Sequence, residues 1–126
     1  MSLLAERGGV PVLQVVAAGV SDDGDAILVT EQAVRGFDEI EDVDDATLTQ
    51  AWTALSRLHA LGIAHREISR RAFVVREDGQ VAITGLDQAR LAADDASLMI
   101  DRVRLLVGSA IGVGSDRAVA AATASL

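Results

Sequence analysis

The strongest constraint on the fold is a helical stripe in the middle of the chain. Four residues recur at i, i+4, i+7 and i+11 and so share one face of a helix: Leu48, Trp52, Leu55 and His59. Asp44 or Asp45 can cap the start of this helix, and Gly62 suits a left-handed stop. The pattern predicts a helix over roughly residues 45 to 61. Because an apolar stripe has to be buried, the rest of the chain must fold against it.

Two β-hairpins are predicted on either side of this helix. Val10 to Val20 and Ala26 to Glu31 are rich in Val, Leu and Ile and are separated by a turn of Asp and Gly. Phe73 to Val75 and Val81 to Thr84 flank the turn Glu77-Asp78-Gly79 in the same way. Each pair of apolar segments therefore predicts two short antiparallel strands.

The remaining segments are a connector and two more helices. Gly36 and the acidic stretch from Asp38 to Asp45 interrupt all periodicity and predict a connector exposed to solvent. Asp94 or Asp95 begins a second long helix, and Ser115 begins an alanine-rich last one. The side of the second helix expected to be buried consists of Leu98, Met99, Val103, Leu105 and Leu106. The order hairpin, helix, hairpin, helices predicts an α+β fold.

Composition limits the function. The 126 residues suffice for one domain, with a core of aliphatic side chains because only one Trp and two Phe are present. The net charge of −8 argues against a nucleic-acid partner. The absence of Cys excludes disulfides and thiolate chemistry. With neither a long apolar run nor a signal-peptide pattern, we expect a soluble segment that does not insert into a membrane.

Several segments resemble those of protein kinases and of aminoglycoside-phosphotransferase-like enzymes. Leu58 to Ile68 is similar to the approach to the catalytic loop. Phe73 to Val75, Asp78 to Thr84 and Asp101 to Leu106 match, in order and spacing, the hairpin and core helix that follow that loop. Ile27 to Glu31 looks like the last strand of the small lobe. The resemblance implies a partial kinase-like fold, made of the end of the small lobe and a mainly helical large lobe with a small hairpin.

This resemblance also implies a division of the chain. Residues 1–3 are interpreted as a cloning scar, 4–37 as the remnant of the small lobe and hinge, and 38–126 as the helical portion of the large lobe, all in one compact domain. If a nucleotide binds, the hinge candidates are Glu31, Gln32 and Ala33.

The residues that transfer phosphate in this family are altered here. Phosphoryl transfer requires a carboxylate beside the nucleophile, an Asn and an Asp on the metal ions, and a Lys on the phosphates. Glu67 stands at the position of the catalytic Asp, Ala72 at that of the Asn, and Gly85 at that of the metal-binding Asp. Asp87 is a weak alternative metal ligand. All 11 basic residues are Arg, so no Lys exists anywhere in the chain. We expect no intact catalytic site and no metal site, and ATP with magnesium only if the chain is an enzyme after all.

The framework around the loop is retained. His59 is predicted to be a packed histidine with a hydrogen-bond partner, and His65 to support the loop from beneath. The resemblance implies that Asp101 accepts hydrogen bonds from the backbone of the His65-Arg66 turn, the alternative being a solvated carboxylate. Arg66, with its neighbours Arg70 and Arg71, forms a basic cluster, which we expect to pair with nearby carboxylates; binding a phosphate or an acidic partner is the alternative.

Three functional hypotheses follow. The first is a non-catalytic pseudokinase that binds a protein partner or the membrane domain of its own parent chain. Its sequence resembles the cytoplasmic kinase-like regions of actinobacterial integral membrane proteins of the lysylphosphatidylglycerol-synthase-like, or flippase-like, class, which implies a cytoplasmic location, at the inner membrane if the parent is membrane-bound. The second is a small-molecule phosphotransferase with Glu67 as base. The third is a structural module that forms a homodimer through an unpaired sheet edge.

Overall fold

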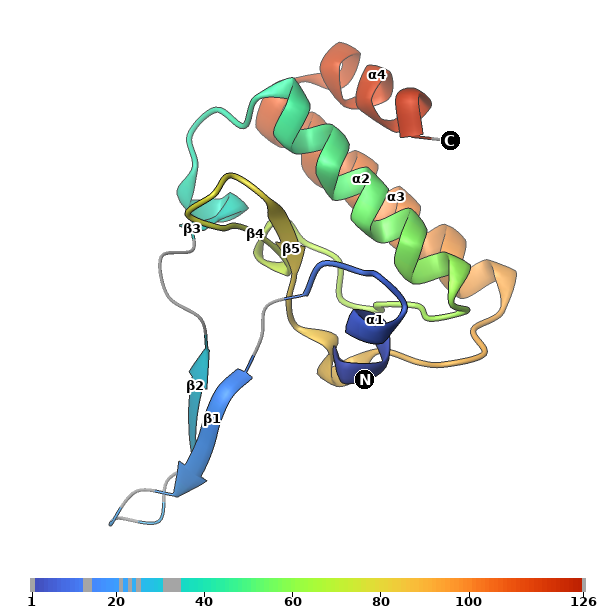
Figure 1. The fold of residues 1–126 in the computed structure, drawn as a ribbon. Coiled ribbons are helices and arrows are strands. Elements are labelled where there is room, and N and C mark those ends of the chain that lie inside the picture. The colour runs from blue at the N-terminus through green and yellow to red at the C-terminus, as the bar shows by residue number, and fades with distance from the viewer. Residues whose placement is uncertain are drawn as a thin grey trace.

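Short strands precede and follow a central helix, and two helices complete the chain (Figure 1). The computed structural model describes residues 2–12, 15–20, 22, 24, 26–30 and 35–125. The helices are α1 (Ser2–Arg7), α2 (Asp45–Ala60), α3 (Asp95–Val113) and α4 (Ser115–Ser125). The strands are β1 (Val15–Val20), β2 (Ala26–Thr30), β3 (Arg35–Gly36), β4 (Phe73–Val75) and β5 (Val81–Ile83). Three 3-10 turns lie between them: η1 (Phe37–Glu39), η2 (Arg70–Ala72) and η3 (Leu86–Gln88).

The central helix α2 forms as the sequence predicts. Asp44 caps it, because its side-chain Oδ1 accepts a hydrogen bond of 2.7 Å from the amide of Thr47. At the other end Gly62 has a φ of +76°, the left-handed conformation that glycine adopts most readily. The predicted apolar stripe is buried along its whole length. α2 is thus the helix against which the sheet and the C-terminal helices pack.

The strands form two separate antiparallel sheets. β1 pairs with β2, as expected, but Val10 to Val12 do not extend this hairpin. Val12 instead forms a parallel bridge with Ile83 in β5, and the amide of Ile83 donates to the carbonyl of Pro11 at 2.8 Å. The prediction of a hairpin strand from Val10 was therefore wrong at its start, because apolar periodicity does not identify the partner strand.

The second sheet has three strands in the order β3-β4-β5. The predicted hairpin of β4 and β5 is present, with Val74 opposite Ala82. Gly36, predicted to begin the connector, instead pairs with Val74 as part of β3. The connector that follows is largely exposed, although Phe37 and Val43 within it are buried.

α3 begins where predicted, because Asp94 accepts a hydrogen bond of 2.8 Å from the amide of Ser97. The face it buries differs from the prediction. Leu105 is buried and Leu98 and Leu106 are partly buried, but Met99 and Val103 are exposed, at 53% and 49%. α3 carries apolar residues on both sides, so its pattern does not reveal which side faces inward. α4 begins at Ser115, as expected, and packs against both α2 and α3.

One hydrophobic core joins the helices and the three-stranded sheet. It includes Ala5, Val10 and Val12, so the chain from α1 to Val12 packs onto the same body as α2. The β1–β2 hairpin projects away from this body in Figure 1. No helix among the described residues combines the length and the apolarity needed to cross a membrane.

Candidate functional site

The loop from Ile63 to Ala72, between α2 and β4, is organised around one buried carboxylate. Asp101 in α3 is completely buried. Its Oδ2 accepts hydrogen bonds from the amide of His65 at 2.7 Å and from Nε2 of His59 at 3.0 Å, and its Oδ1 accepts one from the amide of Arg66 at 3.0 Å. The predicted contact with the His65-Arg66 turn is confirmed, and the alternative of a solvated carboxylate is wrong.

These donors determine the charge of Asp101. Burial alone would raise the pKa of its carboxyl group, but the hydrogen bonds from His59 and from the amides of Arg66 and His65 outweigh burial and lower the pKa below the ordinary value of 3.8. His59 is buried and has a hydrogen-bond partner, as predicted. Its second ring nitrogen, Nδ1, is buried without a partner in the described part of the chain.

His65 supports the loop with both ring nitrogens. Nε2 lies 2.7 Å from the carbonyl oxygen of Thr84, and Nδ1 lies 3.1 Å from the amide of Glu67. Because a carbonyl only accepts and an amide only donates, Nε2 carries the proton and Nδ1 accepts, which identifies the neutral Nε2–H form. With both nitrogens engaged, His65 is part of the framework and is not free to act as a base.

Ala72 and Gly85, the residues that the sequence resemblance places at metal-ligand positions, both lie next to the segment at Thr84 that His65 contacts. The amide of Thr84 donates to the carbonyl of Ala72 at 2.9 Å, which joins the end of the loop to the segment after β5. A Cβ atom at the next residue, Gly85, would lie 3.8 Å from both Cε1 and Nε2 of His65. The fold therefore brings these positions together. Ala72 presents a methyl group and Gly85 no side chain, so neither offers a side-chain oxygen to a metal ion.

The other predicted site residues are less constrained. Glu67 is exposed on the loop and its amide is held by His65. Asp87 lies in η3, but its side chain is outside the described residues, as are the hinge candidates Glu31, Gln32 and Ala33. Within the described ranges, no group of three or more His, Cys, Asp or Glu side chains is arranged to hold a metal ion.

The arginine cluster on the loop does not pair as expected. Arg70 donates to two backbone carbonyls, those of Phe37 at 3.0 Å and Ile40 at 3.2 Å, and to no carboxylate in the part of the chain that the structure describes. Of the three arginines, Arg71 is the one that approaches a carboxylate within the described ranges, that of Asp38 at 3.6 Å on the surface. The prediction of carboxylate pairing was therefore wrong for Arg70, because backbone carbonyls of the connector accept its hydrogen bonds.

Arg66 has an unusual backbone. Its φ of +74° lies in the left-handed region, which costs a non-glycine residue on the order of 1 kcal/mol. Asp101 holds the amide of Arg66, and Nη1 of Arg104 donates to its carbonyl at 2.7 Å. The turn is thus held from both sides by α3, while the side chain of Arg66 remains exposed.

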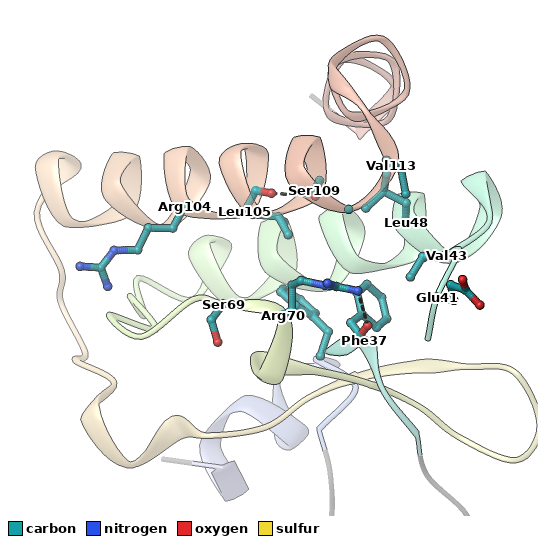
Figure 2. A pocket seen from close by; sticks show the side chains of 13 residues that line it. Phe37, Glu41, Val43, Leu48, Ser69, Arg70, Arg104, Leu105, Ser109 and Val113 are labelled. Atoms are coloured by element: carbon teal, nitrogen blue, oxygen red, sulfur yellow. Dashed lines mark hydrogen bonds between the residues drawn. The ribbon is translucent and has the colours of Figure 1, made fainter. Parts of the chain in front are cut away.

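A small cavity lies between the connector, η2 and α3 (Figure 2). Its volume is about 30 Å³, which is large enough to hold water. Arg70 reaches across it to the carbonyl of Phe37, whose ring packs against Phe73 with centroids 5.6 Å apart. No sequence pattern predicts this cavity, because its walls come from segments that are distant along the chain.

Comparison with known proteins identifies the fold. No protein-family model and no curated protein matches the sequence. Among solved structures, a divergent kinase lacking the glycine-rich loop, which regulates membrane ultrastructure of the Toxoplasma parasitophorous vacuole, is similar at 23% identity and a TM-score of 0.64, over 91% of this chain and 43% of that one. The yeast RNA Pol II CTD kinase CTDK-1 complex is similar at 18% identity and a TM-score of 0.52, over 65% of this chain and 30% of that one.

This chain thus spans less than half of the length of either solved protein. At these identities the likeness concerns the fold. The three-stranded antiparallel sheet and the mainly helical part around α2 and α3 form a partial protein-kinase-like fold.

Proposed function

We propose that this chain is a non-catalytic, kinase-like domain with a regulatory or protein-interaction role. One contrast carries the proposal. Asp101 accepts hydrogen bonds from the amides of His65 and Arg66, and His65 contacts the carbonyl of Thr84. In contrast, Ala72 and Gly85, at the positions that the sequence resemblance assigns to metal ligands, lack the oxygen atoms that magnesium requires. The hydrogen bonds that hold the loop remain, whereas the metal-binding side chains are missing. This combination favours a fold that is retained for its surface.

The charge of the chain supports the same proposal. No Lys is available to contact the nucleotide phosphates, and Arg presents a rigid fork in place of a flexible point charge. Glu67 keeps a carboxylate on the loop, but one methylene longer than the Asp it replaces, and a displacement of about 1 Å can cost a hundredfold in rate. We therefore propose that no ATP, magnesium or other cofactor is needed.

Calorimetric titration with ATP, with and without magnesium, tests this function. We expect no binding tighter than about 1 mM. Magnesium-dependent binding in the low micromolar range would overturn the proposal. If such binding occurs, release of ADP should be measured in two variants. In the enzyme alternative, Glu67→Gln abolishes this release. The matched control Glu77→Gln, on the exposed turn between β4 and β5, retains it.

We further propose that the domain belongs to a larger, membrane-associated protein and works on the cytoplasmic side. The support is the resemblance of the sequence to kinase-like regions of flippase-like membrane proteins. Its partner is then a protein, or the membrane domain of the same parent chain, and not a nucleic acid. Sequencing the reading frame on both sides of this segment tests the proposal, and a complete frame without any membrane span contradicts it.

A further inference from the structure

Helix α3 is apolar on two opposite sides. One side faces the core with Asp101, Leu105 and Ser109. The other, which we call the outer stripe, carries five apolar side chains that are between 49% and 78% exposed: Met99, Ile100, Val103, Val107 and Ile111. It extends over about 18 Å, since an α-helix rises about 1.5 Å per residue. A contiguous apolar stripe that remains exposed on a helix is suited to a partner.

A hollow runs beside the outer stripe. This groove has a volume of about 470 Å³. α3 and the loop form its walls, with Ile68, Ser69, Arg70, Val103, Arg104, Val107, Gly108 and Ile111. Four of these residues also line the small cavity of Figure 2: Ser69, Arg70, Arg104 and Gly108. The groove is shallow and connects the outer stripe to the loop that Asp101 holds, so a helix can lie along it.

The charges in the groove select the partner. Among the described residues, Arg70 and Arg104 are the charged residues that line it, and no carboxylate does, in a chain whose net charge is −8. Both arginines are held in place, Arg70 by the carbonyls of Phe37 and Ile40 and Arg104 by the carbonyl of Arg66. A groove with two positioned cations is complementary to Asp and Glu side chains.

The same charges disfavour two other occupants. In a symmetric pair of copies the outer stripes would meet around Arg104, and like charges would approach each other. An anionic membrane would attract the two arginines but repel the acidic remainder of the chain, and it would not fill a concave groove.

We propose that the outer stripe and its groove bind an amphipathic helix of a partner protein, with aliphatic side chains on its inner face and acidic residues along the edge that meets Arg70 and Arg104. This inference rests on the interaction role proposed above and specifies the chemistry of the partner. Its test is independent of nucleotide binding. ATP binding would overturn the proposed function, whereas failure of the peptide test below, without ATP binding, would overturn the docking surface alone.

The test uses two fluorescent helical peptides of about 16 residues, roughly the length of the outer stripe plus one turn. Both carry Leu at i, i+3, i+7 and i+10, and their flanking residues are Glu in one and Lys in the other. Fluorescence anisotropy should show that the Glu peptide binds with a Kd on the order of 10 to 100 μM and the Lys peptide at least about tenfold more weakly. Val107→Glu should weaken binding of the Glu peptide at least about tenfold.

Arg104→Glu supplies the decisive comparison, because it should reverse the preference in favour of the Lys peptide. Val119→Glu on α4 and Arg57→Glu on α2, also exposed, are the matched controls and should leave binding unchanged. Three results would overturn the proposal: neither peptide binds; sedimentation shows a dimer that Val107→Glu abolishes; or vesicles of phosphatidylglycerol and phosphatidylcholine bind the protein through Val107 while the Glu peptide does not.

Discussion

At the scale of single residues, Asp101 determines the geometry of the loop. One buried carboxylate accepts from three donors, and two of these are amides that belong to consecutive residues of the loop. Buried amides that lose their acceptor cannot form hydrogen bonds to water instead. The stability of both the loop and the core therefore depends on the side chain of Asp101.

Removing this carboxylate should be costly. Asp101→Ala leaves the amides of His65 and Arg66 and Nε2 of His59 without an acceptor, and we expect it to lower the free energy of unfolding by about 3 kcal/mol or more. Urea denaturation followed by circular dichroism measures this loss. Glu77→Ala, in an exposed turn, is the control and should change stability by less than about 0.5 kcal/mol. A loss below about 1 kcal/mol for Asp101→Ala would contradict the importance of these bonds.

The pKa of Asp101 predicts an acid-sensitive contribution. The pKa lies below the ordinary 3.8 in the folded chain, so the stabilisation is complete above pH 3.8 and is lost as the pH falls through the lower, folded value. Asp44 and Asp94 have lowered pKa values too, because they accept hydrogen bonds from Thr47 and Ser97, so the effect must be isolated by difference.

The urea midpoints of the wild type and of Asp101→Asn supply this difference. It should shrink as the pH falls below about 4 and the carboxylate becomes protonated. A difference that stays constant down to about pH 3 would contradict an ionised Asp101.

The sequence predicted part of this network. The contact between Asp101 and the His65-Arg66 turn followed from the resemblance to kinases, and a polar residue beside the apolar Leu105 signals a buried partner. That His59 is the third donor was not foreseeable, because the two residues are 42 positions apart and no local pattern links them.

At the scale of elements, glycine has two effects on the helices: it ends a helix, and inside a helix it lowers the helix propensity. Gly62 ends α2 in the left-handed conformation, and a Cβ there would meet only the backbone of Ala92 at 3.9 Å or more. Gly108 lies inside α3, and a Cβ there would meet nothing within 4 Å. Neither site is crowded, so backbone conformation decides the effect of Ala at each.

The same substitution should therefore act in opposite directions at these two sites. Gly62→Ala forces a side chain into the left-handed region and should destabilise the chain by about 1 kcal/mol or more. Gly108→Ala improves helix propensity and should stabilise it by up to about 1 kcal/mol. Thermal unfolding of the two variants measures both effects, and equal signs would show that packing outweighs backbone conformation.

Elements with a single apolar face were predictable, and those without one were not. α2 has one apolar stripe, an Asp cap and a Gly stop, and all three signals indicate the same helix. α3 has apolar residues on both sides, so its start at Asp94 was predictable but its buried face was not. β3 has two residues, too few for any periodic signal.

At the scale of the whole molecule, contacts distant in sequence join the ends of the chain to the body. Val12 joins the edge of β5. At the other end, Arg117 of α4 contacts the connector before α2, donating to Asp45 at 2.7 Å, to Asp42 at 3.0 Å and to the carbonyl of Val43 at 2.7 Å. Sequence reasoning found α2, the β4–β5 hairpin and the starts of α3 and α4, but it found neither α1 and β3 nor these contacts, since the contacts depend on how the elements pack.

The β1–β2 hairpin is the exception, because each of its strands packs mainly against the other (Figure 1). A two-stranded hairpin alone is only marginally stable in water. Hydrogen exchange should therefore show its amides to be at least about tenfold less protected than those of β4 and β5, which pair within the sheet over the core. The β4–β5 amides are the internal control, measured in the same sample. Equal protection would mean that the hairpin is held by the body and unfolds with it. The expected difference would mean that the hairpin opens independently, while the loop held by Asp101 and the outer stripe of α3 belong to the stable unit that presents the proposed docking surface.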